Sequence, residues 1–265
     1  MVGILDEAAQ VKNFLPFMEP VWRALAPWGY TLIRFATGAI FVPHGVQKIM
    51  AGNYWLGGLE AVGGVLIALG FVQRTMAILL LVEVLWLITV NIGKGWLWTR
   101  GGVQYHVFQL GLLLSVVIGG AGLHAIMRET NERLIALGYT LARVWMAFLI
   151  LPSGYEKIFQ DGVARIAAGN VLKTGFYPPM LWAWVVAWLE LAGMLMLAAG
   201  LLTRPIAFMF FVEMAVITFM IQMPNGYFWT SRGCEFALLL TVISFAFVLG
   251  GGGRYSVDRR IGREF

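Results

Sequence analysis

Four glutamates lie inside continuously apolar stretches of this 265-residue chain. Glu60 and Glu83 are in the first half, and Glu190 and Glu213 are in the second. A carboxylate at the centre of a bilayer costs about 2.5–3.5 kcal/mol on insertion scales, so such a group normally turns inward and pairs with a cation or serves a function. These residues are therefore the first candidates for chemistry.

Cations lie near both ends of the same stretches, and two interpretations follow. Helix order pairs Lys48 with Glu60 and Lys157 with Glu190 at one end, and it pairs Arg34 with Glu83 and Arg143 with Glu213 toward the other. In the first interpretation, structural ion pairs fix the helix register and include Arg34, Lys48, Glu83, Arg143, Lys157 and Glu213. In the second, the carboxylates form a proton path, with Glu60 and Glu190 as the catalytic proton acceptors.

Two glycine-bounded loops, 95–102 and 226–233, carry aromatic residues and one arginine each. Trp98, Arg100, Trp229 and Arg232 are the candidate cofactor-binding residues: aromatic walls stack a quinone ring, and the arginines donate hydrogen bonds to it or to a small anion. Gln104 and Glu235 follow the loops at matching positions and would line the same site. The alternative is an interfacial aromatic belt with snorkelling arginines.

The histidines and the single cysteine limit the redox chemistry. His44 and His106 lie near the outer ends of two first-half stretches, as a haem-binding pair would, but Ser153 and Ala237 replace them in the second half. We therefore expect neither haem nor a metal. Cys234 is the only cysteine, so the chain cannot relay electrons through a dithiol of its own.

The elements that position these residues are membrane-spanning helices. The chain is 60% hydrophobic and 12% charged, whereas about a quarter of the residues of a soluble domain are charged. Eight apolar stretches approach the ~20 residues that a span requires, and their continuous rather than alternating character favours helices. They cover 31–50, 57–72, 75–93, 102–121, 138–159, 180–202, 205–223 and 233–250. The predicted class is an all-α polytopic membrane protein.

The two halves repeat one pattern. Arg34, Gly45 and Lys48 recur as Arg143, Gly154 and Lys157 at a spacing of 109, Glu60, Gly70 and Glu83 recur as Glu190, Gly200 and Glu213 at 130, and the loops recur at 131. Charged residues that return in register predict two tandem four-helix bundles. An even number of spans makes the two copies parallel.

Domain boundaries follow from this repeat. We expect an interfacial segment over 1–29, a first unit over 30–122, a short solvated helix as linker over 123–137, a second unit over 138–253 with an outer loop at 160–179, and a basic tail over 254–265. Ten basic residues on the side of the termini against seven on the other favour cytoplasmic termini. The scattered basic residues argue against a nucleic-acid partner, despite the net charge of +5.

The order of the motifs resembles the DoxX/DoxD superfamily over about 30–258. The resemblance lies in an arginine early in the first helix (Arg34, Arg143), Gly-x-x-Lys near its end, a glutamate opening the second helix (Glu60, Glu190), a Gly-x-x-x-Arg turn, and a terminal Gly-Gly-Gly-x-x-Ser-Val-Asp. It implies a four-helix membrane bundle per unit. Among characterised relatives, it implies a membrane subunit of thiosulfate:quinone oxidoreductase.

Three functions are therefore expected, in this order. The first is a bacterial inner-membrane subunit of a quinone-linked redox complex, with sulfur-compound oxidation as the candidate reaction and other membrane or periplasmic subunits as partners. The second is a non-catalytic scaffold or accessory subunit surrounded by lipid. The third is a small-anion transporter.

Overall fold

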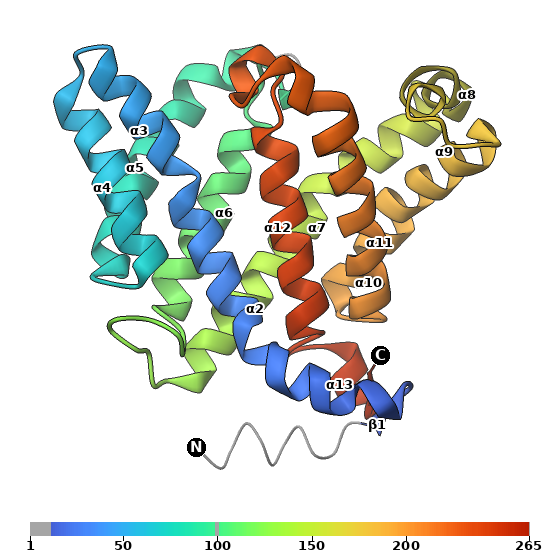
Figure 1. Cartoon of the computed structure of the whole chain (residues 1–265), viewed down its shortest axis with the longest axis horizontal. Helices are drawn as coiled ribbons and strands as arrows, with labels where there is room; N and C mark the ends of the chain where they lie inside the picture. Colours follow the sequence, from blue (N-terminus) through green and yellow to red (C-terminus); the bar gives the residue numbers. More distant parts are fainter. Residues whose placement is uncertain (1–11, 99–100, 265) are drawn as a thin grey trace.

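The computed structural model describes residues 12–98 and 101–264 and is built almost entirely from helices (Figure 1). The elements of the first half are β1 (Lys12–Asn13), η1 (Pro16–Met18), α2 (Glu19–Ala39), α3 (Phe41–Met50), α4 (Tyr54–Leu69), α5 (Gln73–Asn91), η2 (Ile92–Lys94) and α6 (Gln104–Gly119).

The second half has the same order of long helices, with π-helical segments between them. Its elements are α7 (Glu132–Phe159), α8 (Val163–Ile166), η4 (Ala167–Val171), α9 (Pro179–Trp188), η5 (Leu189–Gly193), α10 (Met194–Ala199), α11 (Thr203–Val216), η6 (Ile217–Gln222), η7 (Met223–Asn225), η8 (Trp229–Ser231), α12 (Glu235–Gly250), α13 (Val257–Arg260) and β2 (Arg263–Glu264). Of these, η4, η5 and η6 are π-helical.

Within residues 12–98 and 101–264, four helices are long and apolar enough to cross a membrane, rather than the eight expected. They are Gln73–Lys94, Glu132–Phe159, Pro179–Ala199 and Thr203–Asn225. Three more apolar helices, Tyr54–Leu69, Gln104–Gly119 and Glu235–Gly250, have 16 residues each. At 1.5 Å per residue such a helix is about 24 Å long, short of a ~30 Å hydrocarbon core.

The two halves share one core. Helices α2, α6, α7 and α12 occupy the middle of the molecule, with α4 and α5 on one side and α10 and α11 on the other (Figure 1). The last helix of each half packs against the first helix of the other, α12 on α2 and α6 on α7. One continuous cluster of buried apolar side chains therefore includes residues of both halves.

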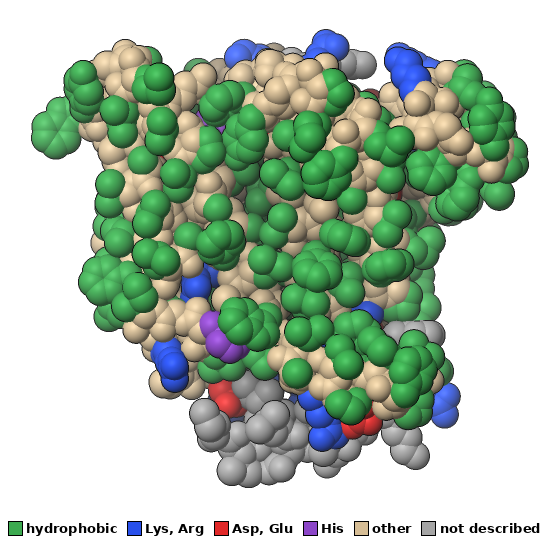
Figure 2. Space-filling model, in the orientation of Figure 1, with side chains coloured by type: hydrophobic (Ala, Val, Ile, Leu, Met, Phe, Trp, Pro, Cys, Tyr) green, Lys and Arg blue, Asp and Glu red, His purple; other side chains and the backbone are tan. Residues whose placement is uncertain are grey.

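Outside this core, hydrophobic side chains cover the middle of the face shown in Figure 2. Most of the charged side chains visible there lie toward the upper and lower ends of that face. Large apolar residues such as Trp55, Phe148 and Phe208 are exposed along the helices. A surface of this kind suits contact with lipid.

Three segments differ from the expectation. Residues 19–29 belong to the long helix α2, which continues past Pro27. The linker contains no helix until α7 begins at Glu132, where the Asn131 side chain caps the first turn. The insertion is helical rather than a loop: α8 and η4 pack on α9 through a small separate core of Val163, Ala167, Val171, Ala183 and Ala187.

Two glycines allow helices to approach closely where the polar clusters form. A Cβ atom on Gly45 would lie 2.6 Å from the carbonyl oxygen of Gly57, and one on Gly154 would lie 2.6 Å from the backbone nitrogen of Leu191. Backbone atoms cannot move away as a flexible side chain can. Glycine at these positions therefore lets α3 contact α4 and α7 contact η5.

The two ends of the described chain meet on one side of the molecule. β1 and β2 pair in parallel, with Lys12 opposite Arg263 and Asn13 opposite Glu264. They lie at the lower end in Figure 1, and the loops between α5 and α6 and between α11 and α12 lie at the upper end.

Candidate functional site

In the first half, one lysine contacts two buried glutamates. Lys48 Nζ lies 2.8 Å from Glu60 Oε1 and 2.6 Å from Glu83 Oε1. The first contact is the expected one. The second corrects the expected pairing of Glu83 with Arg34. The other carboxylate oxygens, Glu60 Oε2 and Glu83 Oε2, are buried without a hydrogen-bond partner among the described residues.

In the second half, the equivalent lysine contacts one glutamate. Lys157 Nζ forms an ion pair with Glu190, as expected. Glu213 was expected to pair with Arg143, but among the described residues it forms no ion pair, and neither of its carboxylate oxygens has a hydrogen-bond partner there. It lies beside Glu190 instead, close enough for a carboxyl–carboxyl hydrogen bond.

The two buried arginines bind backbone carbonyls rather than glutamates. The Arg34 guanidinium donates to the carbonyls of Ala68 at 3.0 Å, His124 at 3.0 Å, and Ala121. Arg143 donates to the carbonyls of Tyr255 at 2.8 Å, Ala198 at 3.4 Å, and Gly252. The last carbonyls of a helix have no partner within it and carry partial negative charge, so they attract a cation.

These contacts recur in register between the halves. Ala68, Ala121 and His124 are equivalent to Ala198, Gly252 and Tyr255 at spacings of 130, 131 and 131. The neighbouring contacts follow the same rule: Tyr30 donates to the Gly120 carbonyl and Tyr139 to the Gly251 carbonyl, at 3.0 and 2.7 Å.

A third polar cluster lies between the two halves. His44 on α3 places Nε2 2.5 Å from Glu235 Oε1 at the start of α12, and the Tyr105 hydroxyl on α6 donates to the same carboxylate oxygen. The second oxygen, Glu235 Oε2, accepts the Trp229 backbone N–H at 3.0 Å. Glu235 is fully buried, whereas the His44 side chain is 16% exposed. We refer to His44, Glu235 and Tyr105 as the His–Glu–Tyr cluster.

Aromatic rings surround the His–Glu–Tyr cluster. Phe228 packs edge-on against the His44 ring, with centroids 5.3 Å apart, and Trp229 packs against the Tyr105 ring at 5.4 Å and the His106 ring at 5.2 Å. Tyr227 lies in the same loop, where burial and then the negative charge of Glu235 raise its pKa. Its phenol therefore remains neutral near pH 7.

The cluster has no equivalent elsewhere in the repeat. Positions equivalent to His44, Tyr105 and His106 hold Ser153, Phe236 and Ala237, and Gln104 is equivalent to Glu235. Sequence reasoning named His44 and His106 as asymmetric and Glu235 as a lining residue, but it did not find Tyr105. The missing signal is the packing of α12 beside the first half, which a repeat pattern does not contain.

The expected site in the aromatic loops forms only in part. Trp98 packs edge-on against Phe236 at 5.4 Å, and Trp229 packs against Tyr105, so both tryptophans turn toward the core. Arg232 is exposed, with a positive φ of 61°. Arg100 lies outside the described residues. Trp98 and Trp229 therefore belong to one group of packed rings, connected through Phe236 and Tyr105, whereas Arg232 lies at the surface.

The two histidines considered for haem are both neighbours of Tyr105, whose ring centroid lies 6.4 Å from that of His44 and 5.6 Å from that of His106. His106 is buried and interacts with Gln109 Oε1 at 3.2 Å.

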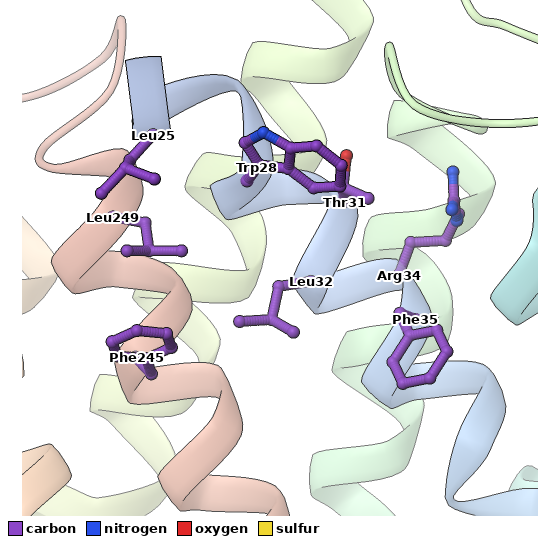
Figure 3. Close-up of a pocket in the computed structure, with 8 residues that line it drawn as sticks. All are labelled: Leu25, Trp28, Thr31, Leu32, Arg34, Phe35, Phe245 and Leu249. Carbon is purple, nitrogen blue, oxygen red and sulfur yellow. The ribbon is translucent and has the colours of Figure 1, made fainter. Parts of the chain in front are cut away.

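A groove of about 400 Å³ runs between α2 and α12, nearer the end with the termini (Figure 3). Leu25, Leu32, Phe35, Phe245 and Leu249 form its apolar walls. The Arg34 side chain extends away from these walls in Figure 3, and the Thr31 hydroxyl is engaged with His124 Nδ1 at 3.2 Å. The groove therefore offers apolar surface rather than a polar binding site.

Residues 138–223 match the DoxX family model. The match lies within the second of the two expected units. A protein of Haemophilus influenzae, described as uncharacterized, is 28% identical over 121 residues, which cover 44% of this chain and 86% of that protein. No solved structure matches this chain. The DoxX match and the apolar helices together identify a helical membrane protein.

Proposed function

We propose that this DoxX protein is a membrane subunit of a quinone-linked redox complex, and that a quinone head group binds at the His–Glu–Tyr cluster. The observation that carries the proposal is the buried Glu235 carboxylate, which holds the partly exposed His44 in a fixed orientation. Sulfur compounds are the electron source suggested by the resemblance to thiosulfate:quinone oxidoreductase subunits.

His44 has the geometry to bind a ligand through its second ring nitrogen. Its Nε2 is engaged by Glu235, whereas its Nδ1 has no hydrogen-bond partner among the described residues. A carboxylate that holds one ring nitrogen fixes the orientation of the imidazole. Nδ1 is then placed to form a hydrogen bond with an oxygen of a quinone or quinol head group.

The surroundings suit the rest of a quinone. Phe228 packs against His44, and Trp229 packs against Tyr105 and His106. Exposed apolar side chains cover the helices, and an isoprenoid tail can lie along them. Reduction of a quinone to a quinol takes up two electrons and two protons. The protons would come through His44 and the Glu60 or Glu190 carboxyls, and the electrons from a donor carried by a partner subunit.

The arrangement in the membrane completes the proposal. The recurring arginine, lysine and tyrosine contacts support two parallel four-helix units that share the central helices. The excess of basic residues on the side of β1 and β2 favours cytoplasmic termini in a bacterial inner membrane. The His–Glu–Tyr cluster would then lie toward the outer face, where a periplasmic partner could supply electrons.

Quinone binding by the purified protein tests this function. We expect a short-chain quinone to quench tryptophan fluorescence saturably, because Trp229 borders the cluster. His44→Ala and Glu235→Gln should each weaken the apparent affinity at least about tenfold, the equivalent of one lost hydrogen bond to a charged group at about 1.5–3 kcal/mol.

His124→Ala is the matched control, because His124 stacks on Trp28 of α2, with ring centroids 4.0 Å apart, and is not part of the His–Glu–Tyr cluster. It should bind quinone as the unaltered protein does. Equal affinity in His44→Ala, Glu235→Gln and His124→Ala would contradict the proposed site.

A second function, an accessory subunit without a ligand, is favoured by the protruding helices α8 and α9. They form a separate small core at one edge of the molecule and expose Tyr177, Leu181, Trp184 and Trp188. A lateral aromatic surface of this kind suits a neighbouring membrane protein. Absence of quinone binding, together with a partner that co-purifies in fixed ratio and is lost on Trp184→Ala, would favour this function.

A further inference from the structure

The carboxyl pair in the second half is short of positive charge. In the described part of the chain, Glu190 and Glu213 face one ammonium group, that of Lys157, which forms an ion pair with Glu190 and none with Glu213. We propose that Glu190 and Glu213 hold one exchangeable proton between them and so form a proton-binding site in the membrane-embedded part of the chain. This inference does not depend on quinone binding.

Because Glu190 and Glu213 are buried, the net charge of these two residues and Lys157 determines whether the group holds a proton. Glu190 is 3% exposed and Glu213 is 9% exposed, so water offers neither carboxylate much solvation. Two buried carboxylates and one ammonium leave a net charge of −1, whereas one bound proton makes the group neutral. A like charge at contact distance disfavours ionisation of both carboxyls at once.

The hydrogen bonding of Glu213 points to the same state. Both of its oxygens are buried, and none of the donors in the described part of the chain reaches them. A carboxylate in that position would be left unsatisfied, which is costly away from water. A proton on either glutamate creates the missing donor, because the two carboxyl groups lie within hydrogen-bonding reach of each other.

Within residues 12–98 and 101–264, Lys157 is the one cation that forms an ion pair with either glutamate. Lys157 comes from α7, Glu190 from η5 and Glu213 from α11, and Glu156 adds a further negative charge near Lys157. In the first half, by contrast, Lys48 contacts both glutamates, so each carboxylate there has a cation beside it.

The local backbone also differs between the halves. Glu190 lies in the π-helical segment η5, whereas Glu60 lies in the regular helix α4. A π-helical turn changes the direction in which a side chain points and is frequent at functional sites. The π-helical segment η5 therefore contains Glu190, the residue that faces both Lys157 and Glu213.

Infrared spectroscopy of the protein in lipid vesicles tests the proposal. The full chain should show a C=O stretching band of a protonated carboxylic acid at neutral pH, and the band should shift in D₂O because the proton exchanges. Glu213→Gln leaves one carboxylate for one ammonium, so the part of the band that comes from the Glu190–Glu213 pair should vanish. Glu190→Gln should remove the same part of the band for the same reason.

Glu129→Gln is the control, because the linker residue Glu129 forms an ion pair with Arg74 at 2.6 Å and lies outside the carboxyl pair. Its spectrum should match that of the unaltered chain in this region. A neutral-pH spectrum of the full chain without a protonated carboxyl band would overturn the proposal. The proposal would equally fail if the band kept its full intensity in both Glu213→Gln and Glu190→Gln.

Discussion

Arg34 and Arg143 are the most deeply buried cations among the described residues, at 3% and 1% exposure. Each binds three carbonyls from two different segments. In hydrocarbon these carbonyls would have no alternative partner. A guanidinium presents several donors in a fixed plane, so one side chain can satisfy the end of a neighbouring helix and the turn beyond the last helix of its half. We regard these residues as structural rather than catalytic.

Replacing Arg143 by leucine should therefore destabilise the protein strongly. The carbonyls of Ala198, Gly252 and Tyr255 would lose their donor, and removal of one partner from a buried charged contact costs about 3–5 kcal/mol. Thermal unfolding in detergent measures the loss. Arg165→Gln is the control, since its guanidinium belongs to an exposed pair with Asp161 and should change stability by less than about 1 kcal/mol.

At the residue scale, the sequence identified the charged residues that are buried in the helices, but it predicted only some of their ion-pair partners. Lys48 with Glu60 and Lys157 with Glu190 followed from helix order, because each pair joins the end of one helix to the start of the next. Helix order suggested Arg34 and Arg143 as the partners of Glu83 and Glu213. The arginines bind backbone carbonyls instead, and the sequence could not show this because a carbonyl acceptor has no sequence signature. The His44–Glu235 contact joins positions 191 residues apart, and neither periodicity nor repeat spacing links them.

At the scale of elements, glycines decide whether the lysine and glutamate of each half can meet. Gly45 and Gly57 face each other across α3 and α4, and Gly154 takes the place of Gly45 on α7. Lys48 and Lys157 each follow that glycine by three residues, which is one helical turn. The close approach therefore carries the ammonium group to the neighbouring glutamate.

Gly45→Val should separate α3 from α4 and break the Lys48–Glu60 contact. Its Cβ would lie 2.6 Å from the Gly57 carbonyl oxygen, and overpacking of this kind costs about 1–3 kcal/mol. A lower thermal unfolding midpoint is the expected result. Gly58→Ala is the matched control on α4, because no atom lies within 4 Å of a Cβ there, and it should leave the midpoint unchanged or raise it slightly. Equal midpoints for the two variants would contradict the close-packing argument.

At the scale of the whole molecule, the contacts between the halves rival those within them. Trp145 on α7 lies over Gly111 on α6 and donates from Nε1 to the Val107 carbonyl at 2.8 Å. This contact and the packing of α12 on α2 join the buried apolar residues of both halves into one core. The repeat in the sequence suggested two bundles, and only the packing reveals how far they share their central helices.

One cooperative unfolding transition is the consequence we predict. Gly111→Leu would collide with the Trp145 ring and should lower the unfolding midpoint of both halves together, by about 1–3 kcal/mol in stability. Limited proteolysis during heating can follow cleavage in each half separately. Gly93→Ala is the control: no atom lies within 4 Å of a Cβ at this position, so the unfolding midpoint of neither half should change. Separate transitions for the two halves would show that they fold as independent units.

The order of the helices along the chain also has a consequence for biosynthesis. His44 leaves the ribosome almost two hundred residues before Glu235, and α2 is made long before α12, the helix that covers it. Until the last long helix enters the bilayer, the histidine has no carboxylate to orient it. The nascent chain therefore carries the paired lysines and glutamates of its first half early, but it acquires the polar cluster between the halves only at the end of insertion.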